Sequence, residues 1–504
     1  MAFRTGQIIM RRRTFCAAGL AALAAASLPL RRVSAAGAEI SAVGLDGRQL
    51  TLTPADVADL RAGLRGELLT AGDARYDDAR RLWNAAFDRK PALIARCAGA
   101  ADVMRAVSFA SAHGLLTSVR GGGHSLSGQS VCDGGLEIDL SPMHSVHIDP
   151  AAKLARVEPG TLIGQFDLEA QAFGLATTAG TAADTGIAGL TLGGGLGRIA
   201  PKFGLTIDNF TGAEVVTADG RLLRASASEN PDLFWALRGG GGNFGIVTLF
   251  EYQLHPVGPM LFGGNLTFPL TGARQLMRGF AEFTATAPEE LCATPYFDAD
   301  AQGTPRLGIE VCYCGPPADG ERAVAPLRKL GKPLKDELAA APYVKLQGAT
   351  GPVKPNPYGG YFKGGLVRAL TPALIDAVID YLEAAPPPGL WEISFQPVGG
   401  AANRVAPQAT AFWNRHAAFD MLVASMWKVP GDGAQRSTDW VRAGWAKVEP
   451  FTEGYYVNLA EAQQDAHAHR IQAAYGDNYP RLAGLKKRYD PSNFFRLNAN
   501  IKPA

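Results

Sequence analysis

Short apolar runs and amphipathic stretches alternate along the chain from residue 91 onward. Three runs have the length of buried strands, namely residues 92–97, 115–119 and 136–140. Apolar side chains recur at helical spacing from Val103 to Ala110, and Gly114 ends that stretch. A hairpin over residues 145–157 and a helix over 162–173 follow. The pattern predicts helices and strands that share one α/β region.

The pattern changes after Pro256, where glycine clusters become rare and aromatic residues more frequent. Alternating apolar and polar positions predict strands over residues 307–314, 391–398 and 419–427. A helical pattern covers residues 372–384. Such strands are typical of an antiparallel sheet with one face covered by helices. We therefore expect a second region of α+β type.

The composition is that of a globular enzyme. The chain has 504 residues, enough for two or three domains, and its 49 basic and 47 acidic residues leave a net charge of +2. That balance indicates no nucleic-acid partner. The 59 glycines gather in a few clusters, which favours ligand binding by exposed backbone. The sequence specifies no oligomeric state.

The cysteines predict no metal site. Apart from Cys16 near the N-terminus, they are Cys97, Cys132, Cys292, Cys312 and Cys314. An odd number leaves at least one free thiol, and neither their spacing nor a Cys/His cluster matches a zinc site. We expect buried thiols.

The first 36 residues predict an export signal. Arg12, Arg13 and Thr14 precede an apolar, alanine-rich run over residues 16–30, and Val33-Ser34-Ala35 has the small residues of a cleavage site. The arginine pair is similar to a twin-arginine signal, which would carry the folded protein to the periplasm or the medium. The run is too short for a stable membrane span, so none is expected after signal removal. An ordinary secretory signal or an alanine-rich tail are the alternatives.

A first glycine-rich loop follows the apolar run at residues 115–119. It consists of Arg120, Gly121, Gly122, Gly123, His124 and Ser125. Successive N–H groups in such a loop form an anion-binding nest, and the arginine adds a permanent charge at its edge. A nucleophilic imidazole held against a ligand can bond to it covalently. A glycine-rich turn with a solvated histidine is the alternative.

A second glycine-rich region spans residues 179–197. It lacks both the long preceding strand and the later acidic residue of a dinucleotide-binding fingerprint, so an NAD site is disfavoured. Together with residues 202–209, 215–220 and 232–247, both loops resemble the flavin-linked oxidases related to vanillyl-alcohol oxidase and berberine bridge enzyme. Residues 454–459 and 475–500 resemble the closing segment of the berberine-bridge branch.

The resemblance implies a fold and its division into domains. The fold class is α+β, with a two-subdomain PCMH-type FAD-binding domain and a substrate domain whose antiparallel sheet is covered by helices. The expected segments are the signal 1–36, a lead-in 37–86, the FAD-binding domain 87–256, the substrate domain 257–453 and a C-terminal segment 454–504 that returns to the FAD-binding domain.

The resemblance also implies how FAD is held. His124 would bond to the 8α-methyl group, and Ala182 stands where some relatives carry a cysteine, so no second, cysteinyl bond is expected. Besides the first loop, the implied cofactor contacts are Gly180, Thr181, Thr185, Gly186, Gly189, Gly193, Gly194, Gly195, Gly245, Ile246, Val247, Asn498 and Asn500.

The implied activity is hydride transfer to FAD from an alcohol (a sugar or secondary metabolite) or an amine, with O₂ as the second substrate and H₂O₂ as product. Tyr456 is the expected base and Tyr455 the substitute. Thr185 has nearly the size of the valine that leaves an oxygen pocket open in relatives. The candidates for the pocket wall are Tyr361, Lys363, Gln396 and Arg404. A dehydrogenase with another acceptor and a flavin-binding protein without turnover are the alternatives.

Overall fold

The computed structural model describes residues 38–349, 356–384, 389–459 and 467–504. A mainly parallel sheet lies near the N-terminus, in the order β3 (Glu67–Leu69), β4 (Leu93–Arg96), β6 (Leu136–Asp139) and β5 (Thr117–Arg120). Helix α3 (Ala100–Ala112) connects β4 to β5 and buries Val103 and Val107, as its apolar spacing predicts. Strand β5 starts two residues later than predicted, because Leu116 donates its N–H to Val43 instead.

The strands that come next in the sequence form an antiparallel sheet. Its order is β11 (Leu222–Ser226), β10 (Phe210–Val216), β12 (Ile246–Gln253), β8 (Leu154–Val157) and β7 (Val146–Asp149). The predicted hairpin is β7–β8, and the predicted helix over 162–173 is α4 (Ile163–Gln171). Helices α5 (Ile187–Gly193) and α6 (Ala200–Phe203) follow the second glycine-rich loop, and α7 (Pro231–Leu237) precedes β12.

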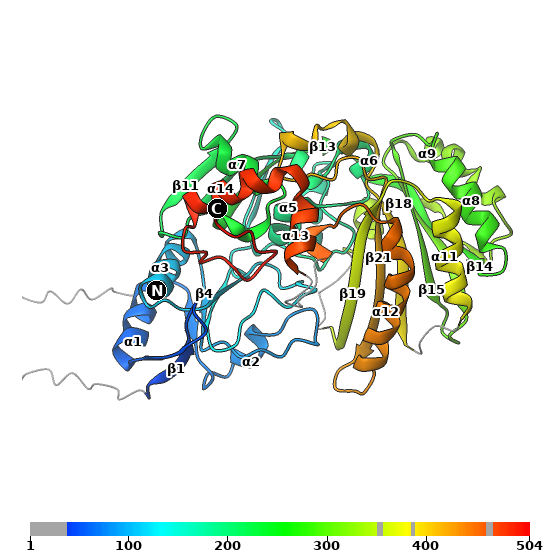
Figure 1. The fold of residues 1–504 in the computed structure, drawn as a ribbon. Helices are drawn as coiled ribbons and strands as arrows, with labels where there is room; N and C mark the ends of the chain where they lie inside the picture. Colours follow the sequence, from blue (N-terminus) through cyan, green and yellow to red (C-terminus); the bar gives the residue numbers. More distant parts are fainter. Residues whose placement is uncertain (1–37, 350–355, 385–388, 460–466) are drawn as a thin grey trace, which may run out of the picture. The chain divides into compact units, whose positions relative to one another are not determined.

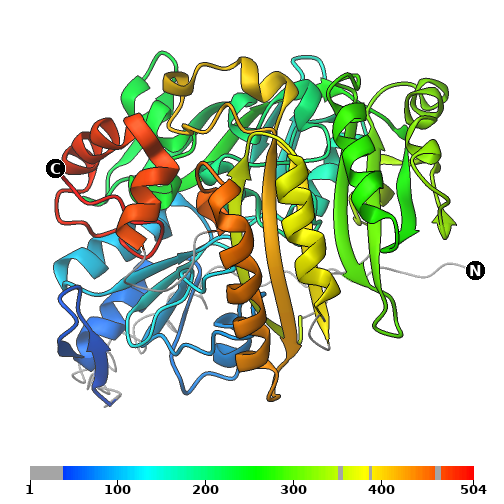
Figure 2. The same ribbon diagram turned by 45° about the vertical axis from the view of Figure 1, so that its right-hand side comes forward.

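All strand pairings of the third sheet among the described residues are antiparallel, as predicted. Its path is β17 (Lys335–Asp336), β14 (Met260–Pro269), β16 (Pro305–Tyr313), β15 (Leu291–Ala299), β20 (Leu390–Pro397), β21 (Phe419–Lys428) and β19 (Tyr358–Val367), and β18 (Ala339–Pro342) pairs with β14. Helices α8 (Ala273–Thr284), α11 (Pro372–Glu383) and α12 (Ala434–Val448) cover one face (Figures 1 and 2). The fold is therefore α+β.

The C-terminal segment lies against the glycine-rich half of the chain. Helix α14 (Tyr479–Tyr489) packs on α7, and α13 (His467–Tyr475) precedes it (Figure 1). Lys486 is fully buried and donates hydrogen bonds to the carbonyls of Asn243 and Phe495 and to Asp490. Lys486 thus links the C-terminal segment to the loop that precedes β12.

Residues Ile40–Ala504 form one compact unit, so the predicted domain boundaries at 86/87, 256/257 and 453/454 fall inside it. In the described part of the chain, the five cysteines are free and buried. No cluster of described residues could hold a metal ion. The predicted export signal lies outside the described residues.

A search of the described helices finds none that is long and apolar enough to cross a membrane.

Candidate cofactor and substrate site

A cavity of about 350 Å³ lies where both glycine-rich loops meet the C-terminal segment. Its lining residues fall within 117–140, 185–192, 241–250, 456–459 and 495–499. The predicted cofactor residues among them are Gly121, Gly122, Gly123, His124, Ser125, Thr185, Gly186, Gly189, Gly245, Ile246, Val247 and Asn498. The cavity is also lined by Leu126, Gln129, Leu190, Asn458 and Phe495, which lie within or next to the recognised segments but had been given no cofactor role.

The two glycine-rich loops touch at Gly122 and Gly186. A Cβ atom on either glycine would collide with the backbone of the other. Gly123 has φ of +75°, a conformation that other residues rarely adopt. Peptide groups rather than side chains therefore form this wall of the cavity, which suits a ligand bound by N–H groups.

His124 stands at the junction of the cavity with the third sheet. Its ring stacks on Trp83 with centroids 4.2 Å apart, and its Nε2 lies 3.7 Å from Asp184 Oδ1. This nitrogen is buried and has no hydrogen-bond partner. Burial lowers the pKa of His124, although the carboxyl group of Asp184 acts in the opposite direction. The imidazole is thus held in one plane and favoured in its neutral, nucleophilic form.

The lead-in segment, for which sequence analysis predicted no site residue, forms a strap beside His124. Asn84 is buried and donates from Nδ2 to Leu126 O (2.8 Å) and Gly360 O (3.0 Å), and Gly360 donates its N–H back to Asn84 Oδ1 (2.9 Å). Trp83 donates its N–H to Gly123 O (2.9 Å) and its indole N–H to Asp184 (3.0 Å). The strap joins the first glycine loop to β19.

Tyr456 also lines the cavity. Its hydroxyl oxygen accepts hydrogen bonds from the Gly195 N–H (3.1 Å) and from Asn458 Nδ2 (2.8 Å). Burial raises the pKa of Tyr456 to about 12, against the effect of these two donors. Gly193 leaves room for Asn458, and Gly194 leaves room for Phe412 and lies in contact with Tyr456. Three predicted cofactor residues, Gly193 to Gly195, therefore surround this tyrosine and are absent from the lining of the cavity.

Several predicted site residues lie outside the cavity lining. Tyr455 donates to Glu449 Oε1 (3.3 Å) beneath the guanidinium of Arg470. Arg120 turns toward the carbonyl of Ala79 and lies 3.8 Å from Glu137. The others outside the lining are Gly180, Thr181 and Asn500. The guanidinium of Arg120 nevertheless lies against Gly123 of the first loop, so its role at the ligand's edge stays a prediction.

Strand register shows which face of the third sheet carries each of the predicted pocket-wall residues Tyr361, Lys363 and Gln396. Tyr361 and Lys363 pair with Ser425 and Val423 on the face that the helices cover, and Arg442 of α12 stacks over Tyr361 at 5.5 Å. Gln396 points to the other face, because it pairs with Asp420. Of these three, only Gln396 belongs to the face nearer the cavity.

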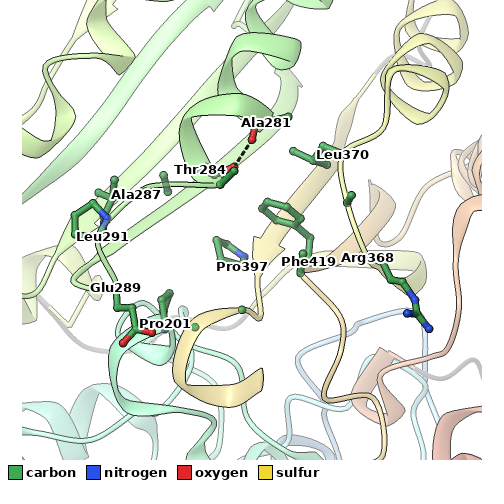
Figure 3. Close-up of a pocket in the computed structure, with 17 residues that line it drawn as sticks. Pro201, Ala281, Thr284, Ala287, Glu289, Leu291, Arg368, Leu370, Pro397 and Phe419 are labelled. Carbon is green, nitrogen blue, oxygen red and sulfur yellow. Dashed lines mark hydrogen bonds between the residues drawn. The ribbon is translucent and has the colours of Figure 1, made fainter. Parts of the chain in front are cut away.

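A second cavity, of about 300 Å³, lies at the end of α8 (Figure 3). Leu291, Leu370 and Phe419 give it apolar walls. Its charged residues are engaged elsewhere, since Glu289 pairs with Arg404 and Arg368 with Glu453. Arg404 thus lies at this cavity and not at the glycine-rich one. The second cavity offers no free reactive group among the described residues.

The fold and the glycine-rich cavity define a PCMH-type FAD-binding protein, and family models agree. The model of the FAD binding domain matches residues 91–226, and that of berberine and berberine-like proteins matches residues 455–502. (R)-6-hydroxynicotine oxidase of Paenarthrobacter nicotinovorans is 31% identical over 453 residues, which cover 87% of this chain and 97% of that protein.

Solved structures show the same relationship. A crystal structure of 6-hydroxy-D-nicotine oxidase from Arthrobacter nicotinovorans matches with a TM-score of 0.80 at 30% identity, over 88% of this chain and 98% of that one. Glucooligosaccharide oxidase from Acremonium strictum, described with 6-S-cysteinyl, 8α-N1-histidyl FAD, matches with 0.79 at 25% identity, over 89% and 99%. The chain belongs to the FAD-linked oxidases of the vanillyl-alcohol oxidase superfamily, in the berberine bridge enzyme-like branch. It is an FAD-linked oxidoreductase.

Proposed function

We propose that the protein is an exported oxidase with FAD bonded through His124, which oxidises a carbon bearing a hydroxyl or an amine and passes the electrons to O₂, giving H₂O₂. The observation that carries this proposal is the buried, neutral imidazole of His124, whose Nε2 lacks a partner in a cavity walled by glycine backbone. The amine and sugar oxidases among its relatives support the reaction class.

The residues around the cavity fit FAD. The N–H groups of residues 121–125 and 186–189 suit the anionic pyrophosphate, and the same cavity is long enough to run from these loops to Tyr456. Bound FAD would supply the hydride acceptor. Asn498 and Gln129, which lie at the end nearer the C-terminal segment, would contact it from the remaining side.

Tyr456 is proposed to hold the substrate's O–H or N–H group and to take its proton. The phenol oxygen accepts two N–H hydrogen bonds, which stabilise negative charge on it. Burial favours the neutral phenol in the free protein. The base role therefore requires that Tyr456 lose its own proton first, and the carboxyl group of the neighbouring Asp420 opposes this while it is charged.

Attachment through His124 alone is proposed. Ala182 stands at the position where some relatives carry the second, cysteinyl link. None of the five cysteines in the described ranges lines the cavity. Of the two covalent links described for the FAD of glucooligosaccharide oxidase, only the histidyl link would therefore be present here.

Acid precipitation tests the attachment. The denatured pellet should stay yellow, and the tryptic peptide that contains His124 should carry the added mass of FAD. His124→Ala should fold and bind FAD reversibly, with slower flavin reduction by substrate. His144→Ala is the matched control, because His144 is exposed and bonds only Ser141 O among the described contacts. A colourless wild-type pellet, or a mass increase on another peptide, would contradict the proposal.

A further inference from the structure

The imidazole of His124 is in contact with side chains from two other segments of the chain. Trp83 of the strap stacks on the ring, with the two planes inclined by 25°. Asp184 of the second glycine-rich loop lies with its Oδ1 3.7 Å from His124 Nε2. Within the described part of the chain, no other carboxyl group lies within ion-pair distance of this ring. One aromatic face and one carboxyl group therefore define the immediate surroundings of the imidazole.

The carboxyl group of Asp184 is oriented by its other oxygen atom. Oδ2 accepts a hydrogen bond from the Trp83 indole N–H (3.0 Å), which leaves Oδ1 as the oxygen nearer to the imidazole of His124. The turn that carries Asp184 is fixed as well, because Gly164 donates its N–H to Ala183 O (2.9 Å). Both the backbone and the side chain of Asp184 are thus held while it faces His124.

Trp83 is anchored by its own backbone. Its N–H donates to Gly123 O (2.9 Å), and its carbonyl accepts from Asn356 Nδ2 (2.8 Å). A single residue of the strap therefore contacts the loop of His124, the His124 ring and the carboxyl group beside that ring. This arrangement fixes the imidazole and the carboxyl group relative to each other.

The two ring nitrogens of His124 have different surroundings. Nε2 is buried and has no hydrogen-bond partner, although 18% of the side chain is exposed. The exposed surface therefore belongs to other atoms of the side chain, and Nδ1 is left as the nitrogen that a ligand in the cavity can reach. A shift of about 1 Å or less would bring Nε2 within hydrogen-bond length of Asp184. A hydrogen bond there places the proton on Nε2 and leaves the lone pair of Nδ1 free.

Formation of a bond at Nδ1 puts a positive charge on the imidazole. Burial disfavours that charge, as the lowered pKa of His124 shows. A carboxylate beside Nε2 counteracts this cost, in the way that the aspartate of a catalytic triad stabilises an imidazolium. Among the described residues, Asp184 is the group in position to do so. The same carboxylate can then remove the Nε2 proton and return the ring to its neutral form.

We propose that Asp184 takes up the Nε2 proton of His124 when FAD is attached, and that Trp83 is the positioning residue that holds this carboxyl group. The inference rests on the proposed function and assigns residues to its attachment step. In that step, a bond forms between Nδ1 and the 8α carbon of FAD, while one C–H bond of the 8α-methyl group and the Nε2–H bond break. The two electrons released pass to O₂, which takes up two protons and leaves as H₂O₂.

The attachment can be followed as a reaction separate from turnover. Full-length protein produced in a riboflavin-deficient host is mixed with FAD in air, and samples are precipitated with acid at intervals. The yellow fraction of the pellet gives the rate, and quenching of flavin fluorescence gives the reversible binding of FAD that precedes attachment. The wild type should form one H₂O₂ per flavin attached. NMR of the isolated flavin peptide should show the bond at Nδ1 of His124.

Variants separate the proton acceptor from a structural role. Asp184→Asn should slow attachment about 10²-fold or more and keep reversible FAD binding within about threefold of wild type, because it deletes only the proton acceptor. Asp184→Ala should be slow too, and formate or acetate should restore part of its rate, because 34% of the Asp184 side chain is exposed. Trp83→Phe keeps the ring stacking and loses the indole N–H, so attachment should slow less than in the Asp184 variants.

Asp149→Asn is the matched control. Asp149 is an exposed carboxyl group of β7 and bonds only the Ala152 N–H among the described contacts. Its removal changes the charge of the same half of the molecule by the same amount, and FAD should be attached at the wild-type rate.

Four outcomes would overturn the inference: attachment at the wild-type rate in Asp184→Asn, a slow Asp184→Ala that neither formate nor acetate accelerates, a bond at Nε2, or loss of reversible FAD binding in both Asp184 variants. The last would make Asp184 part of the binding site instead. Unchanged attachment in Trp83→Phe would refute the positioning role of Trp83. A colourless wild-type pellet would refute the attachment in the proposed function itself, whatever the variants do.

Discussion

At the scale of single residues, the hydroxyl of Tyr456 is the group best placed to handle a substrate proton. It is buried in the cavity wall, and the Gly195 N–H and Asn458 side chain both donate to it. Its neighbour Tyr455 is bonded to Glu449 and packs on the core beneath the helices. Adjacent side chains point apart, so only one of the two tyrosines can serve the site.

We predict that Tyr456→Phe slows flavin reduction by substrate about 10²- to 10⁴-fold, because it deletes the hydroxyl and keeps the ring. The measurement is anaerobic stopped-flow reduction, with flavin content determined in parallel and expected to be normal. Tyr455→Phe is the matched control and should reduce at nearly the wild-type rate. If Tyr456→Phe stayed within about threefold of wild type, another group would have to take the proton.

At the scale of elements, the second glycine-rich loop is held rigidly where it meets the cavity. Thr185 donates its N–H to Ala182 O (3.1 Å) and accepts from Ile163 N–H (2.9 Å). The carbonyl of Thr181 accepts from Arg198, which is itself bonded to Glu310. A larger side chain at position 185 could not be relieved by a shift of this loop and would extend into the cavity.

We therefore predict that Thr185→Leu impairs the reaction of reduced flavin with O₂. Partial obstruction of the path of O₂ should slow reoxidation at least about tenfold, which corresponds to about 1.4 kcal/mol in the barrier. Stopped-flow mixing of photoreduced protein with air-saturated buffer measures the rate, and the wild type should form H₂O₂ stoichiometrically. Thr185→Val, of similar size, should reoxidise like wild type. Slow reoxidation of the wild type, with fast reduction of a quinone, would make the protein a dehydrogenase.

At the scale of the whole molecule, the cofactor cavity exists only when the complete chain has folded. Its lining runs from Thr117 to Ala499. The strap bond between Asn84 and Gly360 spans 276 positions, and that between Gln129 and Asn498 spans 369. An exported protein of this design would have to take up FAD before it leaves the cytoplasm, which fits a route for folded proteins.

This argument predicts the behaviour of the N-terminal arginines. Replacement of Arg12 and Arg13 by Lys should retain the precursor in the cytoplasm, with FAD already attached, because a twin-arginine route requires the pair. Cell fractionation followed by in-gel flavin fluorescence measures both properties. Replacement of Arg31 and Arg32 by Lys, later in the same segment, should leave export intact. Unchanged export of the first double variant would indicate the general secretory route.

The sequence by itself determined the local elements and the family. Apolar spacing located α3, α4 and α11, and alternation located β16, β20 and β21, because these patterns depend on near neighbours along the chain. The glycine-rich loops were recognisable because close backbone contact, as between Gly122 and Gly186, tolerates no Cβ atom. The proposed roles of single site residues stay predictions.

Only the tertiary structure decided which side chains share a site. Trp83 and Asn84 lie in a segment without periodicity, and their partners on β19 are almost 280 residues away. The contacts of Arg120 with Ala79 and Glu137 join positions that no local pattern relates. The physical reason is that hydrophobic spacing records which face of an element is buried, whereas hydrogen bonds and charge balance depend on the groups that folding brings to that face.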